Sequence, residues 1–286
     1  MRGHAGSAAK TARETFMDIS AYFDRIGYRG APRVDLATLK AVHRAHVLAI
    51  PFENLDVQFG VPVSRSAGAV FDKLVTRRRG GWCYEMNGLL GWALEEIGFK
   101  VARLAAAVDR ENRGDSAVGN HLALMVTLDE PWLADAGFGK GLIEPVPLKQ
   151  GPFDNGFLPC RLDRIEGGWW RYRSDPQSEA SSFDLHPDMR EDALLENRCA
   201  WLQSNEASPF VQNAVVQRWR EGEHLCLRGR VLLRHAPAQT TTEMLESEDA
   251  FMRLLKDKFD LDLPEAAALW PKICARHDAL FSACAN

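Results

Sequence analysis

The sequence predicts an α+β protein with more than one domain, and three observations lead to this prediction. Apolar side chains recur at helical spacing through the first 98 residues, whereas residues 99–190 hold short apolar runs separated by glycine, proline, aspartate and asparagine. Helical spacing returns at 191–204, and strand-like runs and then helical ones follow. At 286 residues, the chain also exceeds the usual size of a single domain.

Three helices are expected in the N-terminal part. Residues 18–27 place apolar side chains on one helical face, with Asp18 as the N-cap and Gly27 as the stop. A second helix is expected from Asp35 to Ile50, because Pro51 cannot continue it. A third is expected to begin at or just after Cys83 and to end at Ile97, before Gly98.

Strands are expected in the middle of the chain and again near its end. The first set comprises VARLAAAV (101–108), HLALMVTL (121–128), GLIEPVPL (141–148) and WWRYR (169–173). A connecting helix at 191–204 separates it from a second set, FVQNAVVQRW (210–219) and HLCLRGRVLLRH (224–235), the latter a hairpin turning at Arg228 and Gly229. Two helices, at about 247–258 and 264–276, complete the expected elements.

Composition and charge exclude several classes of protein. Hydrophobic residues make up 46% of the chain and charged residues 26%, which is typical of a globular protein. The net charge of −4 gives no electrostatic reason to expect nucleic acid or an anionic membrane as a partner. Apolar runs are far shorter than the roughly 20 residues that a membrane span needs. Residues 1–17 lack the apolar centre of a secretory signal, so a flexible extension and a cytoplasmic location are expected.

The cysteines and histidines do not predict a metal site. Six cysteines are scattered without a CxxC pair, which argues against structural zinc and against a redox dithiol. His43 and His46 are three residues apart on one helix face, but no third ligand accompanies them. Packing in a core or an interface is the expected role of this pair, and no metal is expected.

The stretch RRGGWCYEMNGLL, residues 78–90, raises the question of what Cys83 does. Two glycines before it permit a tight turn and a close backbone approach. The helix that follows places the thiol at a helix N-terminus, where the helix dipole and unpaired amides lower a thiol pKa. On this stretch alone, Cys83 is either a buried small side chain or a nucleophile.

A nucleophilic thiol needs a base, and the base needs an orienting group. His121 opens an expected strand, and Asp135 ends the next apolar segment. If these segments pair as neighbouring strands joined by the DEPW turn, the two side chains can lie side by side. Downstream, GFGKG at 137–141 lacks the spacing of a P-loop, so we interpret it as a flexible loop lining a pocket. Phe138 within it is expected to be an exposed aromatic side chain available to stack on a flat ligand.

Four segments together resemble the arylamine N-acetyltransferase family: IPFENLD (50–56), RGGWCYEMNGLL (79–90), NHLALMV (120–126) and ADAGFG (134–139). The resemblance implies three domains around a catalytic core like that of the cysteine proteases. The implied layout is an extension at 1–17, a helical bundle at 18–98 carrying the cysteine, a β-barrel at 99–190 carrying the histidine and aspartate, an interdomain helix at 191–208, and a C-terminal α/β lid at 209–286.

The resemblance also implies roles for individual residues. Cys83 matches the family nucleophile, His121 the catalytic histidine and Asp135 the carboxylate that completes the triad. Three residues lie where the family contacts the acceptor or cofactor: Phe138, Lys140 and Leu142. Three others match structural supports of the cysteine loop: Glu53, Arg79 and Glu85.

The activity implied by the resemblance is acetyl transfer from acetyl-CoA, through a Cys83 thioester, to an arylamine, arylhydrazine or arylhydroxylamine. Acetyl-CoA is then a co-substrate, and no metal is needed. Two alternatives use similar chemistry: an amide synthase that takes a polyketide acyl chain from a carrier protein, and a transglutaminase-like thiol hydrolase. A non-catalytic module with Cys83 as a redox switch would need a resolving cysteine nearby, which the sequence does not show locally. Both a monomer and a homodimer are compatible with the sequence.

Overall fold

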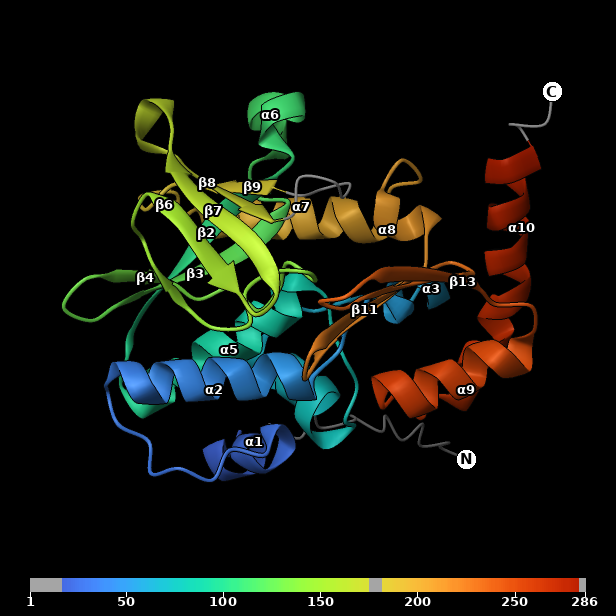
Figure 1. Ribbon diagram of the computed structural model, residues 1–286, viewed down its shortest axis with the longest axis horizontal. Helices are drawn as coiled ribbons and strands as arrows, with labels where there is room; N and C mark the ends of the chain where they lie inside the picture. Colours follow the sequence, from blue (N-terminus) through green and yellow to red (C-terminus); the bar gives the residue numbers. More distant parts are fainter. Residues whose placement is uncertain (1–16, 175–181, 283–286) are drawn as a thin grey trace, which may run out of the picture.

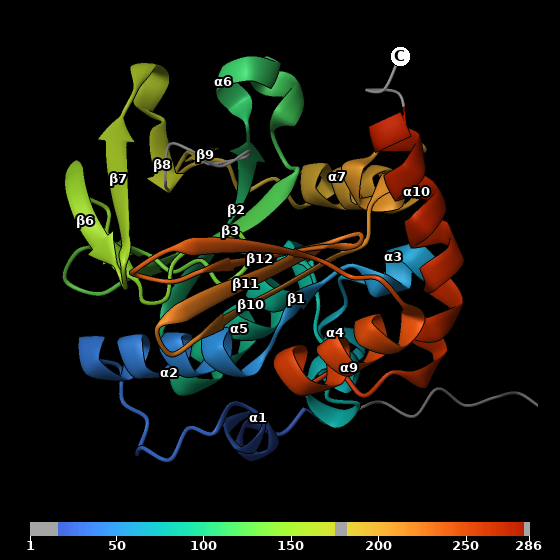
Figure 2. The same cartoon turned by 45° about the vertical axis from the view of Figure 1, so that its right-hand side comes forward.

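The computed structural model describes residues 17–174 and 182–282, which form a mixed α/β molecule (Figure 1). Within these ranges the named strands belong to two sheets in which neighbouring strands are antiparallel. The eight-stranded sheet has the order β5-β4-β3-β2-β9-β8-β7-β6 and curls into half a barrel, whereas the five-stranded sheet has the order β1-β10-β11-β12-β13 (Figure 2). The predicted extension at 1–17 lies outside the described residues except for Met17.

Helices α1, α2 and α5 confirm the three that the sequence predicts in the N-terminal part. The side chain of Asp18 accepts a hydrogen bond from Ser20 N, and Gly27 ends α1 in the left-handed conformation. Two short helices and a π-helical turn before Cys83 were not predicted, because each spans five residues and is too short to show a helical period. The elements are α1 (Ile19–Ile26), α2 (Leu36–Ala49), α3 (Leu55–Phe59), α4 (Ala67–Phe71), the π-turn (Asp72–Thr76) and α5 (Cys83–Ile97).

The half-barrel follows α5, and most of the strands predicted for this region are present. One expectation is wrong: within 141–148 only Val146–Pro147 forms a strand. The preceding loop is held by the side chain of Asn155, which accepts from Ile143 N and donates to the carbonyl of Gly141, so its polar backbone is satisfied outside a sheet. The elements are β2 (Lys100–Val108), α6 (Arg110–Arg113), β3 (His121–Thr127), β4 (Pro131–Leu133), β5 (Val146–Pro147), β6 (Gly151–Asn155), β7 (Leu158–Arg164), β8 (Trp170–Ser174) and β9 (Ser182–Leu185).

Helix α7 (Asp192–Ser204) confirms the predicted connecting helix, but the strand expected at 210–219 is only partly correct. Residues 209–212 form the short helix α8 (Pro209–Gln212), and the strand begins at Val215. The sequence does contain the features that start this short helix. Ser208 caps the helix by accepting from Phe210 N, and Pro209 occupies the first helical turn.

The second sheet and two terminal helices complete the described chain. The β11–β12 hairpin turns at Gly229 and Arg230, one residue later than predicted, and Gly229 has a φ of 58°. The last predicted helix, 264–276, is instead a 3-10 turn at Pro264–Leu269 continued by α10. The remaining elements are β1 (Phe52–Glu53), β10 (Val215–Arg220), β11 (Glu223–Arg228), β12 (Val231–His235), β13 (Thr240–Met244), α9 (Glu248–Phe259) and α10 (Trp270–Ser282).

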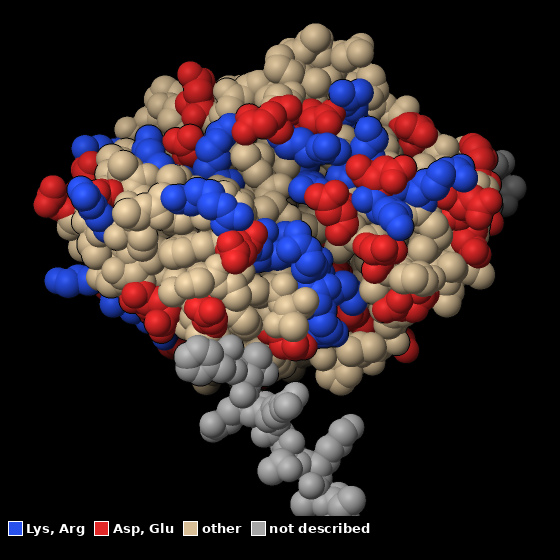
Figure 3. Space-filling view, turned by 90° about the horizontal axis from the view of Figure 1, so that it is seen from below, with Lys and Arg blue, Asp and Glu red and all other residues tan. Residues whose placement is uncertain are grey.

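Three groups of buried side chains hold these elements together. The largest joins α1, α2 and α5 to the inner face of the half-barrel. A second lies between the five-stranded sheet and α9 and α10, while a third surrounds Cys83 and includes residues of α7. On the face seen in Figure 3, Lys and Arg side chains are interspersed with Asp and Glu, apart from a short run of basic side chains near its centre. Within the described ranges, every helix is too short or too polar to cross a bilayer.

Candidate active site

Cys83 is the first residue of α5, and its side chain is buried. The N-cap before it is Trp82, whose backbone N–H donates to the Glu85 carboxylate, so the first turn of the helix is closed by its own side chain. A helix N-terminus stabilises a negative charge through its dipole and amide groups. The thiol therefore lies at a helix N-terminus, as the sequence predicts.

His121 and Asp135 come from neighbouring strands and meet. His121 opens β3, Asp135 follows the end of β4, and the two strands pair antiparallel with Met125 opposite Leu133. His121 Nε2 lies 2.5 Å from an Asp135 carboxylate oxygen, and both side chains are buried. The pairing expected from the DEPW turn is confirmed.

The imidazole of His121 also interacts with the Cys83 side chain, so the three predicted residues lie together. Because Nε2 faces Asp135, Nδ1 is the ring nitrogen that remains for the thiol. Burial alone would lower the pKa of His121, but Asp135 and Cys83 outweigh it and raise that pKa to about 10. At neutral pH this shift favours the protonated form of the imidazole.

The Asp135 carboxylate is held by two more donors. The Asn87 side-chain amide donates to it at 2.8 Å and the Gly137 backbone N–H at 2.7 Å. Burial alone would raise the pKa of Asp135, but His121, Asn87 and Gly137 together lower it. Asn87 was missed in the sequence. Its position four residues after Cys83, on the same face of one helix, was the available signal.

Gly137 packs directly against the first turn of α5. A Cβ at this position would lie 2.8 Å from Cys83 Cα and 2.6 Å from the Asn87 amide nitrogen. The loop after β4 can approach the start of α5 this closely because residue 137 has no side chain. Because residue 137 has no side chain, the loop that follows Asp135 lies close to Cys83, and this keeps Cys83 near the His121–Asp135 pair.

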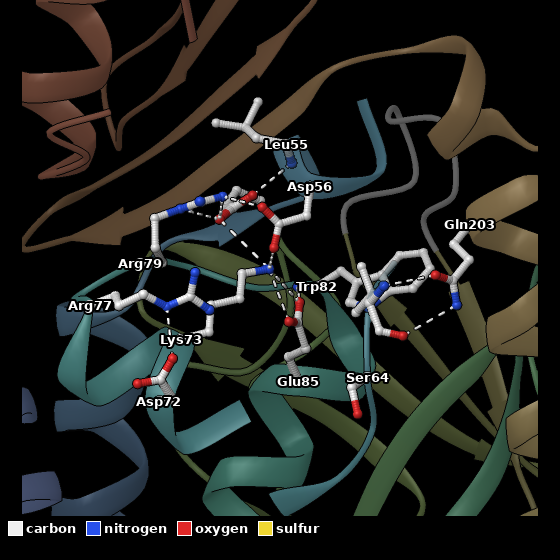
Figure 4. Close-up of polar contacts among 12 residues, drawn as sticks. Leu55, Asp56, Ser64, Asp72, Lys73, Arg77, Arg79, Trp82, Glu85 and Gln203 are labelled. Carbon is white, nitrogen blue, oxygen red and sulfur yellow. Dashed lines mark hydrogen bonds and ion pairs between the residues drawn. The ribbon is translucent and has the colours of Figure 1, made fainter. Parts of the chain in front are cut away.

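A buried cluster of charges lies beneath the cysteine loop (Figure 4). The Arg79 guanidinium contacts Glu53 at 2.7 Å and Asp56 at 3.0 Å, while the Lys73 ammonium contacts Asp56 at 2.8 Å and Glu85 at 2.9 Å. The predicted supports Glu53, Arg79 and Glu85 are thus in contact through two residues that the sequence did not reveal. Lys73 lies in the π-turn, which no periodicity predicts.

The same cluster perturbs the ionisation of Glu85. Burial raises the pKa of this carboxyl, the Lys73 ammonium lowers it and Glu53 raises it again, and the result is a pKa of about 7. With every group ionised, the three carboxylates and two cations sum to −1. A proton on Glu85 would bring the cluster to neutrality.

The two glycines before Trp82 act through close packing. A Cβ on Gly80 would lie 2.3 Å from the carbonyl oxygen of Pro51, and one on Gly81 would lie 2.7 Å from Glu85 Cβ. Neither glycine has a positive φ; in this segment Arg78 does, with a φ of 53°. The close approach expected from the sequence is present, whereas the left-handed turn lies two residues earlier.

Phe138, Lys140 and Leu142 follow Asp135 in the loop after β4. The Phe138 ring is partly buried, with centroids 4.9 Å from Phe183 and 5.9 Å from His121, which corrects the expectation of a freely exposed aromatic side chain. Lys140 is largely buried, and Leu142 packs in the main core with 1% exposure. A Cβ on Gly139 would lie 2.6 Å from the amide nitrogen of Gln217, so β10 also borders this loop.

The histidine pair on α2 lies in the core. His43 and His46 are fully buried, and burial lowers the pKa of His43 to about 4. Among residues 17–174 and 182–282, no group of three or more His, Cys, Asp and Glu side chains is arranged to hold a metal ion.

Comparisons with known proteins identify the family. A family model described as N-acetyltransferase matches residues 35–268. The chain is 36% identical to an arylamine N-acetyltransferase of Mycolicibacterium smegmatis over 269 residues, covering 88% of this chain and 94% of that protein. It is 32% identical to the human arylamine N-acetyltransferase 1 over 278 residues, covering 86% and 95%.

Solved structures agree with these relatives. The structure of the Mycobacterium marinum arylamine N-acetyltransferase in complex with CoA superposes with a TM-score of 0.81 at 32% identity, covering 92% of this chain and 99% of that one. The Salmonella typhimurium enzyme superposes with a TM-score of 0.80 at 27% identity, over 90% of this chain and 98% of that chain. The chain therefore belongs to the arylamine N-acetyltransferase family, whose members are acyltransferases.

Proposed function

We propose that the protein transfers an acetyl group from acetyl-CoA to an arylamine, arylhydrazine or arylhydroxylamine through an acyl-thioester on Cys83. The observation that carries this proposal is the contact of His121 with both the Asp135 carboxylate and the Cys83 thiol at the start of a helix. The M. marinum relative was solved with CoA, which supports acetyl-CoA as the donor.

In the first step the Cys83 thiolate attacks the acetyl carbonyl carbon. The C–S bond to CoA breaks as the new C–S bond forms, and the protonated His121 supplies the proton that the CoA sulfur takes as it leaves. Asp135 keeps its negative charge throughout and holds the imidazole in one orientation. The Cys83 backbone amide at the helix N-terminus is our candidate donor to the developing oxyanion.

In the second step the amine nitrogen attacks the acyl-thioester. The neutral His121 formed in the first step accepts the proton that the nitrogen loses, and Cys83 leaves as the thiolate. The thiolate–imidazolium pair is thereby restored. His121 gives up a proton in the first step and takes one up in the second. Exchange of one thioester for another changes the free energy little, so the acyl-enzyme remains reactive toward a weakly basic aromatic amine.

An aromatic acceptor suits the surroundings of His121. The Phe138 ring lies against His121 and within an aromatic group that includes Tyr172 and Phe183, so a flat apolar ring has partners beside the thioester. Phe138→Ala should therefore reduce amine-dependent deacylation more than acylation by acetyl-CoA. Equal losses in both steps, measured by rapid quench, would remove Phe138 from the acceptor pocket.

We also propose the three-domain layout expected from the sequence, with boundaries near residues 98 and 190 and a core like that of the cysteine proteases. The order of His121, Asp135 and the N-terminal cysteine of α5 supports this core. A cytoplasmic location remains a prediction from the sequence.

Intact-protein mass spectrometry tests the central proposal. Incubation with acetyl-CoA alone should add the mass of one acetyl group, peptide mapping should place it on Cys83, and an arylamine should then remove it. Cys83→Ser should show no stable addition on this timescale. An unmodified wild-type protein that is folded would contradict the acyl-enzyme.

A further inference from the structure

The histidine His43 takes part in no step of the proposed reaction, yet its ring lies close to Asp135. It belongs to α2, which lies below the half-barrel and beside α5 (Figures 1 and 2). Its side chain is fully buried, and burial of a polar side chain is unfavourable unless the protein supplies a hydrogen bond. The contacts of this ring therefore show what it does.

The ring of His43 holds the far end of the loop that follows β4. Its Nδ1 atom lies 3.0 Å from the backbone carbonyl oxygen of Ile143. A carbonyl oxygen only accepts, so Nδ1 carries the proton and donates. Ile143 is itself buried, so its carbonyl needs a donor from the protein rather than from bulk water.

The same ring lies against the near end of this loop. Burial has the largest effect on the pKa of His43 and lowers it to about 4, whereas the Ile143 backbone, the charge of Asp135 and the Asp135 backbone act in the opposite direction. The ring is therefore neutral at neutral pH, with Asp135 beside it. His43 thus interacts with the loop at residue 135 and again at residue 143.

Two asparagines fix the backbone of the same loop. Asn87 accepts from Ala136 N at 2.9 Å, and Asn155 accepts from Ile143 N at 2.7 Å. Each of these asparagines contacts one end of the loop, whereas His43 interacts with both ends. Between the two ends lie the residues expected to contact the acceptor or cofactor: Phe138, Lys140 and Leu142.

Exposed ion pairs accompany His43 on the same face of α2. Lys40 and Arg44 lie 3.5 and 3.6 Å from the Glu144 carboxylate. All three of these side chains are about two-fifths exposed, and exposed ion pairs contribute little to stability. The buried hydrogen bond of His43 is therefore the contact that fixes this loop against α2.

We propose that His43 is a positioning residue for the reaction at Cys83. By holding the loop after β4 to α2 at both ends, it keeps the Asp135 carboxylate against His121. It touches no reacting atom and acts through Asp135. This inference rests on the proposed function, because the reaction that His43 serves is the acylation of Cys83.

Two replacements of His43 separate its hydrogen bond from its volume. Leucine fills a similar space without a donor, whereas asparagine places its amide nitrogen near the position of the histidine Nδ1 and can still donate to Ile143. Folded His43→Leu should acylate Cys83 at least about tenfold more slowly, since misplacement by about 1 Å can cost about 100-fold in rate. His43→Asn should recover most of that loss.

The pH profile of Cys83 alkylation by iodoacetamide gives a second readout. Asp135 raises the pKa of His121, so a displaced Asp135 would make the imidazole less basic and the thiolate would lose its charged partner at a lower pH. The profile should therefore shift toward higher pH in His43→Leu and stay as in wild type in His43→Asn. A residue that only stabilised the core would lower Tm without moving this profile.

The matched control is His46→Leu. His46 is the same residue type on the same helix and is equally buried, but it contacts the Tyr22 hydroxyl of α1 at 3.0 Å. This control should lower Tm and leave both the acylation rate and the alkylation profile as in wild type. Equal slowing in the control, a wild-type rate in folded His43→Leu, or a rate in His43→Asn as low as in His43→Leu would each overturn the inference.

His43→Gln keeps the test decisive if His43→Leu does not fold. Glutamine is one carbon longer than asparagine, so its amide nitrogen comes near the position of Nε2 and away from Ile143. His43→Gln should lose the rate that His43→Asn retains, and equal rates in these two variants would overturn the inference. Alkylation needs no acetyl-CoA. If acetyl-CoA does not acylate the wild type, the proposed function fails, while the alkylation profiles still decide whether His43 positions Asp135.

Discussion

The replacement Gly137→Ala probes how closely the loop after β4 packs against the start of α5. The new Cβ would lie 2.8 Å from Cys83 Cα, 3.0 Å from Cys83 Cβ and 2.6 Å from the Asn87 amide nitrogen. Carbon atoms in ordinary contact are about 3.5–4.0 Å apart, so Cys83 and the loop must separate by roughly 0.5–1 Å. The φ of Gly137 is not positive, so alanine imposes no backbone strain there.

A shift of this size acts on the reaction more than on the fold. Misplacement of a reacting group by about 1 Å can cost about 100-fold in rate, and overpacking a core position costs about 1–3 kcal/mol. Gly137→Ala should therefore lower the rate of Cys83 acylation about 100-fold while the protein stays folded. Stopped-flow measurement of CoA release gives the rate, and thermal unfolding gives Tm.

Gly88→Ala is the matched control, because Gly88 lies in the same helix and a Cβ there meets no heavy atom within 4 Å. It should acylate at the wild-type rate and gain stability, since alanine is favoured over glycine within a helix by about 0.5–1 kcal/mol. If folded Gly137→Ala acylates within about twofold of wild type, the close contact between this loop and Cys83 does not set the reacting distance.

Three further replacements test the electrostatics of the site. Asp135→Asn removes the main charge that raises the pKa of His121, so the rate of Cys83 alkylation by iodoacetamide at neutral pH should fall by at least tenfold. Asn87→Leu removes donors to Asp135 and to the carbonyl of Leu122, leaving buried groups unpaired; Tm should fall by several degrees and alkylation should slow. Glu85→Gln should flatten the pH dependence of stability. The folded pKa of Glu85, about 7, exceeds the roughly 4.3 of an unfolded chain, so its contribution is complete at low pH and is lost as pH rises through 7. Denaturation of the wild type and of Glu85→Gln at about pH 5 and pH 8 measures how the free energy of unfolding of each depends on pH. The same pH dependence in both proteins would contradict the raised pKa of Glu85.

Local signals explain which parts of the fold could be predicted. Helix α5 begins and ends at the predicted residues, because Gly98 ends it and the apolar pattern within it is strong. The His121–Asp135 contact followed from two strands joined by a short turn, whose register brings the side chains together. Both predictions use residues close together in sequence.

Contacts between distant segments were not predictable in this way. Lys73 reaches Asp56 and Glu85 because a π-turn orients it inward, and a single extra residue in a helical turn leaves no trace in the hydrophobic period. Gln217 borders the Gly139 loop because β10, which lies far along the chain, comes to lie beside that loop, and no local pattern specifies this contact. Phe138 is partly buried for the same reason, since its ring meets Phe183 of a later strand.

The glycines and the buried charges around Cys83 serve a common purpose. Gly81 and Gly137 let two backbone segments approach the first turn of α5 from different sides, and a side chain at either position would force that turn to move. Beneath it, Glu85 caps the helix while Lys73 ties the same carboxylate to the charge cluster. Breaking a buried pair by removing one partner typically costs about 3–5 kcal/mol, so the first turn of α5 is held in place by sterics and by charge at once. The proposed acyl transfer requires this fixed position, because the Cys83 thiol would then face both an imidazole and an incoming thioester, and effective molarity falls when the reacting group moves.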